Sequence, residues 1–350
     1  MGSLKPFKGF KTLSLSSLST HFSFPALYRA LESRPVTFRT MSASATGNKP
    51  RLALVTGGAG FIGSHLTDAL IAQGLRVRVL DNFVAGPREN VNPAAEIVVG
   101  DVRVPDSIRP AFAGVDCVFH LAALPRVMLS IEHPVETHLT NVVGTLNALI
   151  AARDAGVRRF IYSGSSSVYG DQPKLPLRES MTPNPLNPYA LQKLAGEQYT
   201  RMFHRLFGMS TLTLRYFNIY GPRMATVGAY VTVIGVFIRE KIAGRPLIIH
   251  GDGSQRRDFT HVRDAVRANL AAMDAAVGDG RALNVGRGEN LSVNEIAEII
   301  GGPVVHVERR PGDARDTLAD LTETRAALRW EPEVATPDGV RELMRLAGCP

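Results

Sequence analysis

From residue 51 onward, short apolar runs alternate with segments whose apolar residues recur at helical spacing. A run at residues 52–56 precedes a helical pattern at 61–73, in which Ile62, Leu66 and Leu70 share one face and Gly74 marks the end. Further runs follow at residues 76–81, 96–101, 117–123 and 159–163. Strands that alternate with helices are typical of a parallel sheet with right-handed crossovers. The pattern therefore predicts an α/β protein with a doubly wound parallel sheet.

A glycine-rich turn joins the first predicted strand to the first predicted helix. Gly57, Gly60 and Gly63 supply backbone freedom, close approach to a pyrophosphate and close packing of helix on strand. The free N–H groups and the dipole at the start of this helix favour phosphate charge. Asp81 ends the next strand, and its carboxylate suits a ribose 2′-hydroxyl but repels a 2′-phosphate. The pattern therefore predicts NAD as the cofactor in preference to NADP.

Polar residues also mark the ends of the next two predicted strands. Asp101 is a candidate partner for the adenine amino group, with a surface carboxylate as the alternative. His120 lies among apolar residues, so we expect it to pack or to orient its loop, not to transfer protons. The small side chains of Ala122 and Ala123 would let the backbone approach the cofactor. A helix is expected over residues 135–155.

A cluster of hydroxyl groups follows the fifth predicted strand, at residues 163–170, and Tyr189 and Lys193 follow at a helix start. Residues four apart lie on one helix face. A phenol whose pKa is about 10 is a poor base at neutral pH, but a nearby ammonium and an oxidised nicotinamide lower that pKa. We therefore expect Tyr189 to remove a proton from a substrate hydroxyl, while Lys193 tunes it and holds the nicotinamide ribose.

Positive charge is concentrated near the N-terminus. The 350 residues carry a formal net charge of +8, and residues 1–50 contribute +6 of it through seven basic residues and one acid. This segment also holds nine serines and has no compact apolar run, so we expect an organellar transit segment over residues 1–48, for a plastid or a mitochondrion. The alternative is a tail on a cytoplasmic enzyme. The remainder is nearly neutral, which argues against nucleic-acid binding.

The sequence also bears on membranes, disulfides and metals. No uninterrupted run of about 18 apolar residues occurs, so no membrane span is expected. Cys117 lies in the apolar run 115–119, far in sequence from Cys349. We therefore expect a buried thiol in a strand, and neither a disulfide nor a metal site.

Taken together, these motifs resemble the extended short-chain dehydrogenase/reductase family, in its epimerase and dehydratase branch, over about residues 51–345. The segments 215–223 and 251–261 are similar to substrate-domain motifs of that branch. The resemblance implies a NAD-binding Rossmann domain at residues 49–217 and 262–288, and a smaller α/β domain for a nucleotide sugar at 218–261 and 289–350. It also implies a homodimer formed through helices near residues 141–155 and 188–207.

Site residues carry over from the resemblance position by position. The implied cofactor contacts are Gly57, Gly60, Phe61, Ile62, Gly63, Asp81, Asn82, Asp101, Val102, Leu121, Ala122, Ala123, Tyr189, Lys193 and Tyr216. The implied substrate contacts are Arg126, Ser165, Ser166, Tyr189, Asn218, Arg257, Arg310, Asp313 and Thr317. Ser165 matches the catalytic hydroxyl, although Ser166 stays open for that role, and register favours Arg257 over Arg256 as the diphosphate ligand. A small residue at Thr317 leaves room for an N-acetyl group.

Departures from the family pattern narrow the reaction. Dehydratases of the branch usually carry an Asp-Glu pair where Ser166 and Ser167 stand, and glucuronate decarboxylases commonly carry Glu in place of Ser167. The resemblance therefore implies NAD-dependent 4-epimerisation of a UDP-hexose, UDP-Glc/UDP-Gal or UDP-GlcNAc/UDP-GalNAc, through a 4-keto intermediate. A UDP-glucuronate 4-epimerase or decarboxylase is the alternative. A non-catalytic NAD-binding scaffold is another, although such relatives tend to lose the catalytic hydroxyls and lysine.

Overall fold

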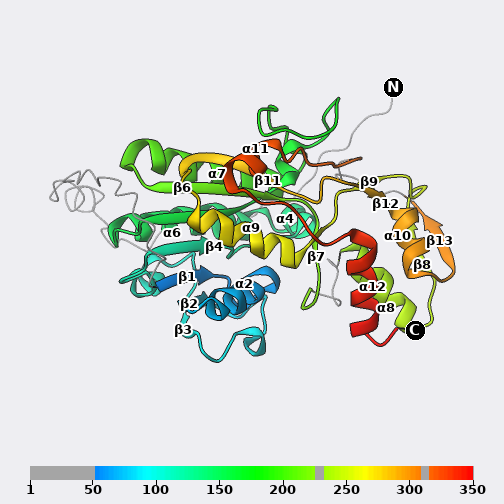
Figure 1. The fold of residues 1–350 in the computed structure, drawn as a ribbon, viewed down its shortest axis with the longest axis horizontal. Helices are drawn as coiled ribbons and strands as arrows, with labels where there is room; N and C mark the ends of the chain where they lie inside the picture. Colours follow the sequence, from blue (N-terminus) through cyan, green and yellow to red (C-terminus); the bar gives the residue numbers. More distant parts are fainter. Residues whose placement is uncertain (1–51, 225–231, 309–314, 350) are drawn as a thin grey trace, which may run out of the picture. The chain divides into compact units, whose positions relative to one another are not determined.

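A seven-stranded parallel sheet organises the fold (Figure 1). The computed structural model describes residues 52–224, 232–308 and 315–349. The sheet contains β1 (Leu52–Thr56), β2 (Arg76–Asp81), β3 (Glu96–Val99), β4 (Cys117–His120), β5 (Arg159–Ser165), β6 (Ser210–Tyr216) and β11 (Asp279–Val285). Their order is β11-β6-β5-β4-β1-β2-β3, and every neighbouring pair is parallel. The doubly wound α/β fold predicted from the sequence is confirmed.

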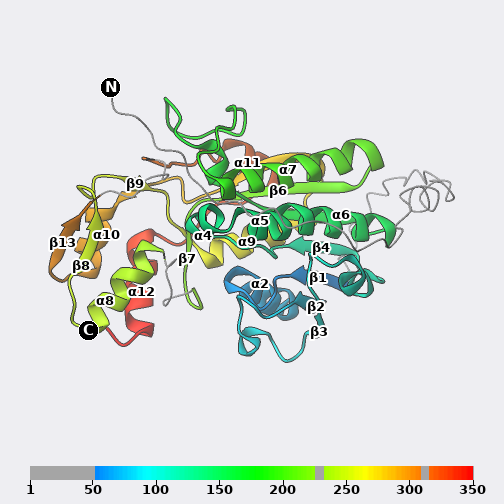
Figure 2. The same cartoon turned by 180° about the vertical axis from the view of Figure 1, so that it is seen from behind.

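Helices cover both faces of this sheet, because successive strand residues point to opposite sides. Ala53 and Val55 of β1 pack in one apolar cluster with α2 (Phe61–Ala72) and α9 (Val262–Asp274). Leu52 and Leu54 pack in another, with α3 (Pro105–Ile108), α6 (Gly144–Asp154) and α7 (Pro188–Phe207). Figure 2 shows α5 (Pro134–His138), α6 and α7 together on that second face. Short helices η1 (Arg88–Asn90) and η2 (Arg109–Phe112) lie in the connections, and α11 (Thr322–Leu328) packs beside α9 and β11.

The expected helix at residues 135–155 contains a wider turn. After α4 (Val127–Glu132), the chain forms α5, then the π-helix η3 (Leu139–Val143), then α6 without a break. Such π segments occur often at functional sites. Here the π turn contains Asn141, whose side chain is buried and bonded to the loop after β4. That loop begins at Leu121, because β4 ends at His120 and not at Ala123 as predicted.

A second group of elements has an apolar core of its own. The strands β8 (Leu247–His250) and β13 (Val304–Val307) pair in parallel, and α8 (Val233–Ile242), α10 (Val293–Ile300) and α12 (Thr336–Leu346) pack around them. The chain forms two further small strand pairs where it passes from one group of elements to the other. These pairs are β7 (Ile219–Tyr220) with β10 (Thr260–His261), and β9 (Arg256–Arg257) with β12 (Leu291–Ser292). The domain boundaries drawn from the sequence stay a prediction.

Three further observations concern membranes, metals and thiols. None of the described helices is both long enough and apolar enough to cross a membrane. Within residues 52–224, 232–308 and 315–349, His, Cys, Asp and Glu form no group suited to a metal ion. Cys117 is a free thiol with no exposed surface, as predicted. Burial raises the pKa of this thiol to about 12, so it is inert at neutral pH.

Candidate active site

The glycine turn after β1 leaves room and donors for an anion. Gly57 has a φ of +71°, and a Cβ there would lie 2.7 Å from the Ala122 nitrogen. A Cβ on Gly63 would lie 2.2 Å from the Gly57 oxygen, so only glycine allows α2 to start so close to β1. Among the described residues, none caps the first turn of α2 with a side chain, and that turn contains no acid. Its N–H groups and its positive dipole end are therefore available to a phosphate.

Asp81 is held at the end of β2 beside this turn. Its carboxylate accepts the N–H of Ala59 at 2.9 Å and the N–H of Phe83 at 2.8 Å, one on each oxygen. Only 8% of Asp81 is exposed. Each oxygen keeps a further lone pair, so the carboxylate can still accept hydroxyl protons.

Asp101 lies close to the same edge but is already well bonded. Asn82 donates to its Oδ2 at 3.1 Å, and the Arg103 guanidinium forms an ion pair with it at 2.6 Å. This hydrogen bonding from Arg103 lowers the pKa of Asp101 to about 2. The neighbouring Val102 is buried, where Gly144 makes room for it. A contact between Asp101 and adenine stays a prediction.

His120 is the centre of a buried hydrogen-bond chain whose direction can be read from its partners. Thr145 donates to the Asn141 carbonyl at 2.7 Å, so its oxygen accepts from His120 Nε2 at 3.1 Å. His120 Nδ1 therefore accepts the Thr56 hydroxyl at 2.8 Å, and Thr56 accepts the Ala122 N–H. Burial lowers the pKa of His120 to about 3. The ring is neutral and holds its loop, as the sequence predicts.

Tyr189 and Lys193 enter the site from the first turns of α7. Asn187 caps this helix by accepting the Ala190 N–H at 2.9 Å, and the Ser130 hydroxyl accepts the Tyr189 N–H at 3.0 Å. Lys193 is 5% exposed, donates to the Ser163 carbonyl at 2.8 Å and lies 5.1 Å from the centre of the Tyr162 ring. Burial lowers its pKa to about 8.

The phenol of Tyr189 is a weak acid in this setting. Burial raises its pKa to about 12, and a side-chain hydrogen bond with Ser165 opposes that rise. The sequence predicts that a nearby ammonium lowers this pKa, but the Lys193 ammonium donates to the Ser163 carbonyl. Lowering the pKa of Tyr189 therefore needs more positive charge than these side chains bring to it.

Ser165 ends β5 and caps the short helix η4 (Ser166–Tyr169). Its oxygen accepts the Ser167 N–H at 3.2 Å and lies 2.8 Å from the Ser167 hydroxyl oxygen. Ser166 is buried, whereas Ser165 and Ser167 are half-buried. Ser165 therefore contacts Tyr189, and Lys193 contacts Ser163 of the same strand, whereas the catalytic roles of Ser165, Tyr189 and Lys193 stay a prediction.

The strand beside β5 carries a buried ion pair under this place. Arg215 pairs with Gly164 across the strands and binds Glu197 of α7 at 2.6 Å, and both side chains are almost fully buried. Glu197 is one turn beyond Lys193. Tyr216 pairs with Ser165 across the strands, and its hydroxyl bonds with Ser163 and Asn269. Contact between Tyr216 and a cofactor stays a prediction.

A second cluster gathers several of the predicted substrate residues. Asn218 donates to the Asp258 carbonyl at 2.8 Å and to the Thr317 hydroxyl at 3.3 Å. Asp258 has no exposed surface, and its carboxylate accepts N–H groups of Arg287, Gly288 and Ala319. This one side chain therefore binds two separate chain segments, at residues 287–288 and at Ala319, close to Thr317.

The remaining predicted substrate residues lie in different places, and the structure describes only some of them. Arg257 donates to the Arg315 carbonyl at 2.6 Å, which places it beside Thr317. Arg256 instead binds Asn290 and forms an ion pair with Glu295 at 3.0 Å. Arg126 is the N-cap residue immediately before α4 and is half-buried. Arg310 and Asp313 lie outside the described residues.

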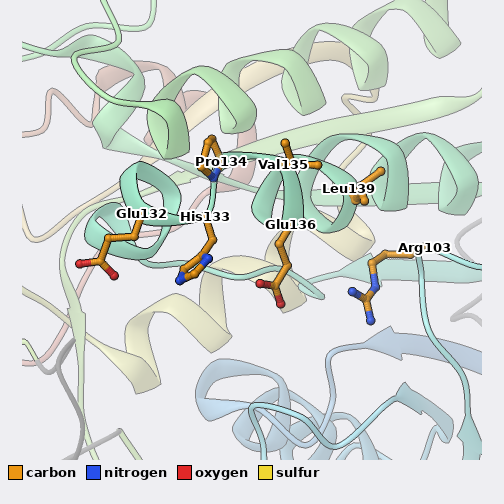
Figure 3. Close-up of a pocket in the computed structure, with 7 residues that line it drawn as sticks. All are labelled: Arg103, Glu132, His133, Pro134, Val135, Glu136 and Leu139. Carbon is orange, nitrogen blue, oxygen red and sulfur yellow. The ribbon is translucent and has the colours of Figure 1, made fainter. Parts of the chain in front are cut away.

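A surface hollow of about 450 Å³ opens beside α4 and α5 (Figure 3). Its lining residues are Arg103, Glu132, His133, Pro134, Val135, Glu136 and Leu139. The charged ends of Glu132, Glu136 and Arg103 lie along one side of the hollow in Figure 3. It contains none of the predicted catalytic residues, and its charges of both signs indicate no particular ligand.

Comparison with known proteins identifies the family. The model of the NAD-dependent epimerase/dehydratase family matches residues 53–286. The chain belongs to this family. It is 38% identical to a putative UDP-glucose 4-epimerase of Methanocaldococcus jannaschii, over 83% of this chain and 96% of the relative. It is 34% identical to UDP-glucuronic acid decarboxylase 1 of Arabidopsis thaliana, over 85% of this chain and 70% of the relative.

A solved structure agrees with this assignment to the epimerase/dehydratase family. A UDP-N-acetylglucosamine 4-epimerase of Methanobrevibacter ruminantium, in complex with UDP-N-acetylmuramic acid, superposes with a TM-score of 0.80. The two chains are 33% identical, and the match covers 85% of this chain and 98% of the other.

The cofactor of this epimerase/dehydratase chain is NAD, and its residues fit that group. The cradle at Gly57 and Gly63 would be filled by any Cβ, and among the described residues no side chain caps the start of α2 beside it. Asp81 is the acidic residue at the end of β2 that suits an unphosphorylated ribose. The NAD prediction is confirmed, whereas the role of each single residue stays a prediction.

Two structural groups of this epimerase/dehydratase chain were missed by sequence reasoning. Asp258 gave no local signal, because its partners at Arg287, Gly288 and Ala319 are far away in sequence. Glu197 gave a weak signal, since it lies four residues after Lys193 on the same helix face. Its partner Arg215 could not be found from that spacing alone.

Proposed function

We propose that this chain is a NAD-dependent UDP-hexose 4-epimerase, which interconverts UDP-Glc and UDP-Gal, UDP-GlcNAc and UDP-GalNAc, or both pairs. The observation that supports this most is the chemistry beside Tyr189. Residues 165–167 are all serines, and the two half-buried ones lie 2.8 Å apart at their oxygens. Hydroxyls can orient a sugar oxygen, but they cannot act as the acid and base that elimination of water requires.

The mechanism follows from what each side chain can do. Tyr189 removes the proton of the C4 hydroxyl and later returns it, with the Ser165 hydroxyl bonded to the same region. Lys193 lies one turn further along the same helix, where the Ser163 carbonyl fixes its ammonium, and it is expected to hold the nicotinamide ribose. NAD, when bound, supplies the acceptor and the donor of hydride at C4, so the reaction has no net oxidation. The 4-keto sugar must turn over between the two transfers so that C4 is inverted.

The second cluster fits the nucleotide end of the substrate. Arg257 carries a planar guanidinium that suits a diphosphate, and Asn218 lies beside it with a polar amide. Thr317 is small and is tied to Asp258 and Asn218, so it leaves space for a 2-acetamido group. Arg310 and Asp313 are expected to hold phosphate and ribose.

The alternative reaction is 4-epimerisation or decarboxylation of UDP-glucuronate. The similarity to a plant UDP-glucuronic acid decarboxylase favours keeping it as a second candidate. Ser167 argues against decarboxylation, because it offers a hydroxyl where that class commonly has a carboxylate.

A product analysis decides between these reactions. The full-length protein with NAD is incubated separately with UDP-Glc, UDP-GlcNAc and UDP-GlcA, and the products are identified by NMR. We expect equatorial and axial C4 epimers of one or both uncharged sugars. Release of CO₂ and formation of UDP-xylose from UDP-GlcA would contradict the proposal.

A substitution at the base tests the mechanism. Tyr189→Phe should reduce kcat by at least about 100-fold, because it removes the group that accepts the proton. NAD binding should persist, since the glycine turn and Asp81 are unchanged. If wild type and variant both bind NAD but convert none of the three sugars, the scaffold hypothesis is favoured.

A further inference from the structure

Two serine hydroxyl groups, of Ser167 and Ser165, form a row that leads to the Tyr189 oxygen. The Ser165 and Ser167 oxygens lie 2.8 Å apart, and the Ser167 N–H donates to the Ser165 oxygen at 3.2 Å. The Ser165 hydroxyl in turn forms a side-chain hydrogen bond with Tyr189. Ser167 therefore lies one hydrogen bond away from the hydroxyl that contacts the base.

The number of hydrogen bonds that the Ser165 oxygen can accept limits which hydroxyl donates to which. A serine oxygen has one proton to donate and two lone pairs that accept. One lone pair of Ser165 already receives the Ser167 N–H. If the Ser167 hydroxyl fills the second lone pair, Ser165 keeps only its proton, which it must donate. If Ser165 instead donates to Ser167, it can only accept from Tyr189.

The chemistry of Tyr189 selects the first arrangement. A phenolate has no proton and can only accept hydrogen bonds, so it needs a donor at Ser165. We propose that Ser167 is a positioning residue that fixes the Ser165 hydroxyl as a donor to the Tyr189 oxygen. Ser167 acts on the base through Ser165. This inference rests on the proposed function, because it takes Tyr189 as the base.

The side chain at position 167 therefore influences whether the Ser165 proton is directed toward Tyr189 or away from it. A hydroxyl there can donate toward Ser165, whereas a carboxylate there can only accept. An acceptor would draw the Ser165 proton away from Tyr189 and reverse the row. The donor at Ser167 thus favours proton removal by Tyr189.

Three substitutions at Ser167 separate these possibilities in the full-length protein with NAD. Ser167→Ala removes the donor, Ser167→Asp replaces it by an acceptor, and Ser167→Thr restores a hydroxyl. We expect kcat to fall about 10-fold in the alanine variant and further in the aspartate variant, while KM stays within about twofold. The threonine variant should recover most of the loss. Ser180→Ala, at an exposed serine outside the site, is the matched control.

A second readout is independent of turnover and of the identity of the sugar. The phenolate of Tyr189 is titrated by its ultraviolet absorbance in the NAD-loaded protein, with the Tyr189→Phe protein subtracted. Loss of the donor at Ser167 should raise the midpoint by about half a unit to one unit, because the phenolate loses stabilisation. Ser167→Asp should raise it more, and Ser167→Thr should leave it near the wild-type value.

Several results would overturn the inference. A midpoint that is unchanged or lower in Ser167→Ala would mean that Ser167 does not supply the donor. An equal loss in the threonine and alanine variants would mean that the hydroxyl does not matter. If the alanine variant does not fold, the aspartate and threonine variants decide by the same comparison. If wild type converts no UDP-sugar, the proposed function fails, but the titration still judges the role of Ser167.

Discussion

Lys193 shows how a single side chain is placed for chemistry at the expense of stability. The residue is 5% exposed, and its ammonium has the Ser163 carbonyl and the Tyr162 ring as partners. Burial lowers its pKa from 10.5 to about 8. The unfolded chain therefore binds more protons than the folded chain between pH 8 and 10.5, so the free energy of unfolding should rise with pH across that window. Below pH 8 the full destabilisation is present.

Lys193→Met should therefore lose activity and gain stability. We expect kcat to fall by at least about 100-fold, because the side chain expected to hold the nicotinamide ribose loses its hydrogen-bond donors. At pH 7 the free energy of unfolding should rise by about 1 to 3 kcal/mol, because no ammonium has to be buried. Thermal unfolding at pH 7 and at pH 10 measures the change in stability, and steady-state kinetics measure kcat. A lower Tm at pH 7 in the variant would contradict this account of the lysine.

At the level of whole elements, the distance between β1 and α2 depends on glycine. A Cβ at Gly63 would meet the Gly57 carbonyl oxygen at 2.2 Å, whereas a Cβ at Gly60 would meet the same oxygen at 3.1 Å. The first distance requires the helix to move, and the second can be relieved by a shift of a few tenths of an ångström. Within one turn, an added Cβ would therefore cause a severe clash at Gly63 and only a mild one at Gly60.

Gly63→Ala should weaken NAD binding much more than Gly60→Ala. We expect at least about a 100-fold rise in Kd for Gly63→Ala, because the N–H groups of α2 are displaced from the phosphate position. The effect of Gly60→Ala should be within about 10-fold. Calorimetric titration with NAD measures both constants. Equal losses at the two positions would show that the close approach of helix and strand is not the reason for the glycine.

The elements also show which parts of the fold could be predicted from the sequence. The start of α2 at Phe61 and the end of β2 at Asp81 were predicted because a glycine turn and an apolar run are local signals. The π turn at Asn141 could not be predicted, because it carries no local signal and the partner of Asn141, Leu124, belongs to a different segment. The hydrogen bonds that the Asp258 carboxylate accepts could not be predicted either, because their donors belong to distant segments. In the active site, residue types were predictable, whereas hydrogen-bond directions required coordinates.

At the scale of the whole molecule, one helical surface carries exposed apolar side chains. On α7, Leu191, Met202 and Leu206 are 58%, 48% and 60% exposed, and their spacing places them on one side of the helix. On the preceding helices, Val135 and Leu139 are 71% and 42% exposed and lie one turn apart. An exposed apolar stripe of this kind favours association with another chain.

We expect a homodimer through this stripe. The double variant with Met202→Lys and Leu206→Lys should shift the mass measured by light scattering at micromolar concentration from dimer to monomer. Ile248 and Val305 are also exposed apolar residues, on β8 and β13, and their double replacement by Lys is the matched control. A wild-type protein that is monomeric at that concentration would contradict the expectation.

The segment at residues 1–48 leads to a prediction about location. It is rich in basic residues and serines and contains one acid. Fused to a fluorescent protein in plant cells, it should direct the fusion to plastids or mitochondria. A version with Arg29, Arg34 and Arg39 changed to Glu should stay in the cytosol. Cytosolic fluorescence of the unchanged fusion would favour the alternative of a cytoplasmic enzyme.

The neutral ring of His120 has a consequence for how the enzyme responds to acid. Histidine is the side chain that ordinarily changes charge between pH 5 and 8. Because the pKa of His120 is about 3 and both ring nitrogens are engaged by threonines, the wall of the site keeps one charge state over that whole range. The ring therefore stays uncharged while it holds the loop after β4 in place. A fall of one pH unit in the surrounding cell compartment would therefore leave the charge of this ring, and the hydrogen bonds that hold its loop, unchanged.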